Sequence, residues 1–153
     1  MPGKKRIKVI IDTNLFISFL IGKRLVSLKQ TLVSSIIQLV FSEQNISELK
    51  IVTSRPKFQK YFNQDDVSVL IDLIQAIGKI VKITKEPDLC RDPKDNFLLA
   101  LSDKSKAGYL VTGDTDLLSI REYKGTKIIA IDEFEVLIKQ CTNEQIARPA
   151  SKR

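Results

Sequence analysis

Short apolar runs alternate with longer amphipathic segments along the whole chain. The first run, residues 7–11 (IKVII), is almost continuously apolar, as a strand buried on both faces of a sheet should be. Four further runs predict strands at residues 39–41, 80–83, 109–111 and 127–131. The run at 80–83 is interleaved with lysines, so we expect it at an edge of the sheet.

Segments with helical periodicity separate these runs. Residues 66–77 place apolar side chains along one face of a helix, which ends at Gly78. Helices are predicted at residues 15–20, 26–37, 46–53, 66–77, 95–104 and 133–139. Because strands and helices alternate, the pattern predicts a three-layer α/β/α domain around a parallel sheet of about five strands.

The composition is that of one globular domain. The chain has 153 residues, of which 43% are hydrophobic and 28% charged. We assign residues 1–142 to the domain and residues 143–153 to a basic, flexible tail. No apolar run approaches the ~20 residues that span a bilayer, and the N-terminus does not resemble a signal peptide. We therefore expect a cytoplasmic protein that does not enter a membrane.

The net charge of +7 lies at the two ends of the chain. Four cations open the sequence and three close it: Lys4, Lys5, Arg6, Lys8, Arg148, Lys152 and Arg153. Such ends can hold nucleic-acid phosphates, and they are equally common as solubilising termini. The chain has no histidine, and Cys90 and Cys141 lie far apart, so two free thiols are a better interpretation than a disulfide or a zinc site.

Acidic residues follow the predicted strands. Asp12 and Asp114 come directly after the first and fourth strands, and Asp92 and Asp95 lie between the third strand and the next helix. Glu48 lies in the helix after the second strand. In a parallel sheet all these positions lie at the carboxyl-terminal edge, where such folds bind ligands.

Converging carboxylates require a counter-charge. Two of them ~5 Å apart repel by about 3 kcal/mol at an effective dielectric constant of ~20. All-oxygen ligands favour Mg²⁺ or Mn²⁺, which suit phosphodiester cleavage. Each acid also has an ordinary alternative role: Asp12, Asp92 and Asp114 could begin helices, and Glu48 could lie on a solvated helix face.

Four segments in the same order resemble the PIN domain family and, within it, the VapC-like toxins of toxin–antitoxin pairs. They are VIIDTNLFISFLIG (9–22), FSEQNISELKIVTSRPKF (41–58), CRDPKDNFLLAL (90–101) and YLVTGDTDLL (109–118). The resemblance implies catalytic and metal-binding roles for Asp12, Glu48, Asp95 and Asp114, and a metal-binding role for Asp116. It implies supporting roles for Asn14, Asp92 and Thr112. Glu43 is an alternative to Glu48, but the register from the RPKF segment favours Glu48.

The resulting hypothesis is a divalent-metal-dependent endoribonuclease, the toxin of a toxin–antitoxin pair. A hydroxide generated at Mg²⁺ or Mn²⁺ would attack an RNA phosphodiester in line and leave a 5′-phosphate and a 3′-hydroxyl. The resemblance also implies a homodimer and a small antitoxin partner. Residues 26–37 could supply apolar surface for a partner, although ordinary core is the better interpretation. The alternatives are a non-catalytic PIN-fold protein that binds RNA or protein, and a housekeeping RNA-processing nuclease.

Overall fold

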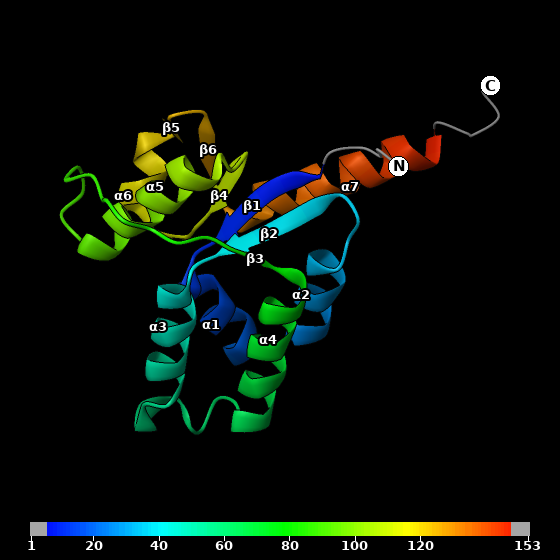
Figure 1. The fold of residues 1–153 in the computed structure, drawn as a ribbon. Helices are drawn as coiled ribbons and strands as arrows, with labels where there is room; N and C mark the ends of the chain where they lie inside the picture. The colour runs from blue at the N-terminus through cyan, green and yellow to red at the C-terminus, as the bar shows by residue number, and fades with distance from the viewer. Residues whose placement is uncertain (1–5, 148–153) are drawn as a thin grey trace.

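A computed structural model describes residues 6–147, which form a mostly parallel sheet with helices on both faces (Figure 1). The strands are β1 (Ile7–Ile11), β2 (Ile37–Phe41), β3 (Lys79–Ile80), β4 (Tyr109–Val111), β5 (Glu122–Tyr123) and β6 (Thr126–Ile129). They lie in the order β3-β2-β1-β4-β6-β5, and β5 is antiparallel to β6. The predicted α/β class and parallel sheet are confirmed, with a sixth, antiparallel strand added.

The described residues contain seven α-helices and one 3₁₀ turn. They are α1 (Thr13–Ile21), α2 (Leu25–Leu32), α3 (Glu43–Thr53), η1 (Pro56–Phe58), α4 (Gln64–Ile77), α5 (Pro93–Ser105), α6 (Thr115–Ile120) and α7 (Ile131–Ala147). In Figure 1, α5 and α6 lie on one side of the sheet and α1 to α4 on the other. No helix in the described range of the chain is both long enough and apolar enough to cross a bilayer.

The central strand β1 contributes to two apolar cores because its side chains alternate between the faces of the sheet. Val9 and Ile11 join the core formed with α1 to α4 and α7, whereas Ile10 joins the core formed with α5 and α6. Val9 pairs with Leu39 of β2 and with Tyr109 of β4. Burial on both faces therefore explains why Val9, Ile10 and Ile11 are all apolar.

The register of β1 and β4 brings their carboxyl ends together. Ile11 pairs with Val111, and the backbone N–H of Asp12 donates to the carbonyl of Val111 at 3.0 Å. Asp12 and Thr112, the residues that follow these two strands, therefore lie at the same edge of the sheet.

The predicted helix at residues 26–37 was too long. Its core positions Leu28 and Leu32 are buried, but α2 ends at Leu32, and Ile37 already belongs to β2. Residue 37 is a strand residue because β2 pairs with β1 there: Ile37 lies in register with Ile7, whose N–H donates to the Ile36 carbonyl at 2.9 Å. Val33, in contrast, is exposed, as Val26 is on α2 itself.

Two further differences concern short strands. The predicted strand at 80–83 shrinks to Lys79–Ile80 at the edge of the sheet, where the Ile80 side chain is exposed. At the opposite edge, Lys124 and Gly125 both adopt positive φ angles (47° and 90°), the conformation of a tight hairpin turn. This turn produces the β5–β6 hairpin, which the sequence analysis did not predict.

The chain ends extend beyond the described residues. The helix α7 reaches Ala147, so residues 143–147 of the predicted tail continue a helix. The cations Lys4, Lys5, Arg148, Lys152 and Arg153 lie outside the described range. Of the two terminal cations that are described, Arg6 contacts the Gln38 side chain, and Lys8 donates to the Ser105 carbonyl at 3.1 Å. The domain boundary itself stays a prediction.

Candidate metal centre

Asp12 links the two central strands at their carboxyl ends. Its side chain is only 7% exposed, and both of its carboxylate oxygens accept hydrogen bonds. The Thr112 hydroxyl donates to Oδ2 at 2.8 Å, and the Asn14 N–H donates to Oδ1 at 3.1 Å, which caps α1. Burial raises the pKa of Asp12 above its usual value, while the bond from Thr112 opposes that shift. Asp12 therefore caps α1, as predicted, and also lies at the carboxyl-terminal edge of the sheet.

Asp95 lies in the first turn of α5 and is 4% exposed. Asp92 precedes it as the helix N-cap and accepts a hydrogen bond from the Lys94 N–H at 2.9 Å, so the cap role falls to Asp92. In the described part of the chain, Oδ2 of Asp95 has no hydrogen-bond partner although it is buried. Burial, together with the charge of Asp114, raises the pKa of Asp95 to about 7.

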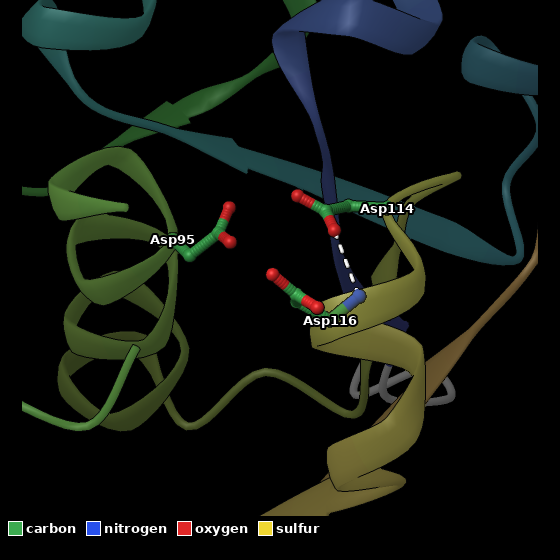
Figure 2. A group of neighbouring side chains, drawn as sticks. All are labelled: Asp95, Asp114 and Asp116. Atoms are coloured by element: carbon green, nitrogen blue, oxygen red, sulfur yellow. Dashed lines mark hydrogen bonds between the residues drawn. The ribbon is translucent and has the colours of Figure 1, made fainter. Parts of the chain in front are cut away.

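Two further carboxylates face Asp95 from the start of α6. The Asp116 N–H donates to Oδ1 of Asp114 at 2.8 Å, so Asp114 caps this helix. The Thr112 hydroxyl accepts from the Asp114 N–H at 3.1 Å and so holds the turn after β4. One oxygen from each of Asp95, Asp114 and Asp116 lies within 4.8 Å of the others (Figure 2).

Glu48 approaches the same site from α3. Its carboxylate forms an ion pair with Lys94 at 2.9 Å. It lines a cleft of about 510 Å³ with Asp12, Asp95 and Asp114, and Asn14 and Asp92 also border this cleft. Glu43, the alternative acid, lies instead beside Ile80 on a different groove. The structure thus brings all four principal acids of the sequence analysis to one cleft.

These residues fit a hard divalent cation. The donors are carboxylate oxygens from the starts of α5 and α6, and one buried oxygen of Asp95 has no protein partner in the described residues. An unpaired buried charge is strongly unfavourable, so such an arrangement favours either a proton or a cation at this point. The tight group comprises Asp95, Asp114 and Asp116, and Asp12 and Glu48 border the same site. Mg²⁺ and Mn²⁺ match this donor set better than zinc.

Several residues around the cleft were not singled out by the sequence analysis. Arg91 forms an ion pair with Asp116 at 3.1 Å, and Arg55 lines the cleft beside Lys94. Asn96 fixes the segment before α5: its Oδ1 accepts from the N–H groups of Leu89 and Cys90, at 3.1 and 2.7 Å. A polar residue in the otherwise apolar stretch NFLLAL was the available signal for Asn96. Lys94 and Arg91 look like ordinary surface cations in sequence.

The fold and the site together define an α/β protein with a carboxylate cluster at the carboxyl-terminal edge of a mostly parallel sheet. A model of the PIN domain family matches residues 8–116, which include every acid of the site. The chain belongs to the PIN domain family, as the sequence resemblance predicted. Nuclease activity and divalent-metal binding are typical of this family.

Two individual proteins give further comparison. The chain is 31% identical over 128 residues to "Uncharacterized protein MJ1680" of Methanocaldococcus jannaschii, and the match covers 78% of each chain. The crystal structure of VapBC2 from Rickettsia felis, bound to a DNA fragment from their promoter, contains a chain with a similar fold. The TM-score is 0.55 at 14% identity, covering 80% of this chain and 98% of that one. This likeness establishes a shared fold.

Proposed function

We propose that this protein is a divalent-metal-dependent endoribonuclease. The observation that carries the proposal concerns Asp95: its carboxylate faces those of Asp114 and Asp116, and its buried Oδ2 has no hydrogen-bond partner among the described residues. An acidic cluster alone could be a solvated surface. A carboxylate that is 4% exposed and lacks a partner in the described residues instead supports a bound ligand of positive charge.

The acids of the cleft form two groups in this proposal. Asp95, Asp114 and Asp116 hold Mg²⁺ or Mn²⁺, and Asp12 and Glu48, which line the same cleft, offer the cation further carboxylate oxygens. When bound, such a cation lowers the pKa of water and neutralises charge on a phosphodiester. The Thr112 hydroxyl keeps the Asp12 carboxylate aimed and also holds the turn at Asp114.

The substrate and partners follow from the family. The chain has the fold of a chain from VapBC2, a complex captured on DNA from its promoter. We infer that this protein is the toxin of a toxin–antitoxin pair, that its substrate is RNA, and that a small antitoxin restrains it. A homodimer and a cytoplasmic site of action complete the proposal. Coexpression with the neighbouring reading frame should then relieve any growth arrest caused by this chain alone.

The nuclease proposal is tested with purified full-length protein and structured RNAs in Mn²⁺. We expect cleavage that EDTA abolishes and products with 5′-phosphate and 3′-hydroxyl ends. Asp95→Asn should reduce the rate by at least about 100-fold, because it removes a ligand charge without changing the side-chain shape. Asp103→Asn is the matched control, since Asp103 lies on the same helix and pairs with Lys124 on the surface. Absence of cleavage, or cleavage undiminished in Asp95→Asn, would sink the proposal.

A further inference from the structure

Two candidate metal ligands are already paired with cations in the described residues. Lys94 pairs with Glu48 at 2.9 Å, and Arg91 pairs with Asp116 at 3.1 Å. The two pairs differ in their surroundings. The Lys94 side chain lines the cleft with Glu48, whereas Arg91 lies outside the cleft lining and is 89% exposed. Of the two paired cations, Lys94 is therefore the one that lines the cleft.

The position of Lys94 follows from the start of α5. It lies one residue before Asp95, between the N-cap Asp92 and the buried ligand, so its stem begins at the rim of the acidic cluster. The Lys94 ammonium lies 2.9 Å from the Glu48 carboxylate, and a lysine ammonium is charged at neutral pH. Its side chain is 62% exposed and is attached through a flexible stem, which permits a second position.

A second cation lies in the same cleft. Arg55, which follows α3, lines the cleft with Lys94. Its positive charge repels the Lys94 ammonium. The remaining charged side chains of the lining are acidic: Asp12, Glu48, Glu86, Asp92, Asp95 and Asp114. The lining therefore combines an acidic set that suits a cation with two basic side chains that suit an anion.

Glu48 cannot serve an ammonium and a divalent cation equally well, because the two compete for the same negative charge. A divalent cation that binds the Glu48 carboxylate weakens the ion pair between Glu48 and Lys94. The released ammonium remains attached to the first turn of α5, in the cleft that Arg55 also lines. An RNA phosphate is the anion that the proposed function supplies there.

We propose that Lys94 is a displaceable counter-ion of Glu48: it neutralises this carboxylate before the divalent cation binds, and afterwards binds an RNA phosphate beside Arg55. The inference rests on the proposed function, since it assumes the metal site and an RNA substrate. It adds that the two ligands assist each other, because binding of the cation releases a phosphate-binding group.

The first experiment measures Mn²⁺ affinity by titration calorimetry on the full-length protein without RNA. Lys94→Met should tighten Mn²⁺ binding by about two- to five-fold, the equivalent of removing a partly exposed ion pair. Lys104→Met is the matched control, because Lys104 is an exposed lysine near the other end of the same helix. It should leave the Mn²⁺ affinity unchanged.

A double variant separates the ion pair from a general charge effect. In a Glu48→Gln background, Lys94→Met should no longer tighten Mn²⁺ binding, because the carboxylate for which Lys94 and Mn²⁺ compete is absent. An equal tightening in this background would overturn the inference, as would unchanged or weaker Mn²⁺ binding in Lys94→Met alone. If neither the wild-type protein nor Lys94→Met binds Mn²⁺, the proposed metal centre fails with it. If the wild-type protein binds Mn²⁺ and cleaves RNA but Lys94→Met binds it unchanged, the counter-ion inference fails alone.

The second experiment tests the phosphate contact with a 12-nucleotide single-stranded RNA. Its affinity is measured by fluorescence anisotropy across salt concentrations, in Ca²⁺ and in EDTA. In Ca²⁺, Lys94→Met should reduce the steepness of log Kd against log salt by about 0.7, which corresponds to one lost phosphate contact. In EDTA the reduction should be smaller, because Lys94 is then paired with Glu48. Equal reductions under both conditions, or none in Ca²⁺, would contradict the release of Lys94.

Discussion

One aspartate is buried at the end of β1 and another at the start of α5, and the two differ in their hydrogen-bond partners. Asp12 is 7% exposed and Asp95 is 4% exposed. Both oxygens of Asp12 accept hydrogen bonds, from Thr112 and from the backbone of Asn14. Oδ2 of Asp95 has no such partner in the described residues. Burial alone therefore does not distinguish a structural carboxylate from one that is available to a ligand.

This difference has a physical consequence for stability. The fold offsets the burial of Asp12 with its own donors, so that carboxylate helps to join β1 to β4. The fold does not offset the burial of Asp95, whose ionised form is unfavourable until a proton or a cation arrives. Asp95 should thus be a site where stability is given up for function.

The largest expected effect is a pH dependence caused by Asp95. Its pKa is raised from 3.8 to about 7, so the folded protein binds this proton more tightly than the unfolded chain does. Stability should therefore fall as the pH rises from about 4 to about 7, and the loss should be complete above that range. In EDTA, we expect the free energy of unfolding to be roughly 3 kcal/mol lower at pH 8 than at pH 5.

Urea denaturation of three proteins checks this expectation. Asp95→Asn should lose most of the pH dependence and should exceed the wild-type stability at pH 8 in EDTA. Asp103→Asn, on the same helix, should keep the wild-type pH dependence. The raised pKa of Asp12 acts in the same direction, so a residual slope is expected in Asp95→Asn. A wild-type slope that survives intact in Asp95→Asn would remove the distinction between the two aspartates.

Metal addition should produce a slightly smaller effect at pH 8. Mn²⁺ at about a hundredfold excess over its dissociation constant should stabilise the wild-type protein by about 2.7 kcal/mol. The stabilisation should decrease at pH 5, where a proton occupies Asp95. Thermal melts with Mn²⁺ and with EDTA measure it. An equal Mn²⁺ shift in Asp95→Asn would show that the ion binds elsewhere.

The third prediction concerns a variant in which an oxygen of Asp12 loses its hydrogen-bond donor, as Oδ2 of Asp95 lacks one among the described residues. Thr112→Val keeps the shape of the side chain but removes the hydroxyl that donates to Asp12 Oδ2. We expect a loss of about 2 kcal/mol, because the hydroxyl donates to a buried charged group and also accepts from the Asp114 N–H at 3.1 Å. Thr126→Val is the matched control: Thr126 is also buried, but its hydroxyl donates to the neutral Ala107 carbonyl, so about 1 kcal/mol is expected. Chemical denaturation at pH 7 compares them, with Thr112→Ser expected to restore stability. Equal losses in the two valine variants would mean that Asp12 gains nothing special from Thr112.

Much of this comparison could be predicted from the sequence. The almost continuously apolar run IKVII predicts the bounds of β1, and the acids that follow β1 and β4 do lie at one edge. The capping signal at Asp92-Pro93 was also correct, and it leaves Asp95 free of that role. These features are local, because strand burial and helix capping depend on residues close in sequence.

Features that depend on tertiary pairing could not be predicted in the same way. Nothing in the sequence shows that Lys94 meets Glu48, because α3 and α5 bring them together only in the folded chain. The partner of Asp12 is likewise a residue of another strand, although the family resemblance singled out Thr112. The lack of a partner for Oδ2 of Asp95 among the described residues is still harder to predict, because it depends on every side chain and backbone group around Asp95 in the fold.

The smallest effect is expected at the exposed pair formed by Arg91 and Asp116. Their side chains are 89% and 51% exposed, so solvent already stabilises both charges. Arg91→Met should therefore change the free energy of unfolding by less than about 0.5 kcal/mol at 50 mM NaCl, and by less at 500 mM, where salt screens the pair. Denaturation at both salt concentrations measures it. A loss comparable with that in Thr112→Val would show that the acidic edge depends on its surface cations as much as on its buried donors, and the contrast between exposed and buried partners would then fail.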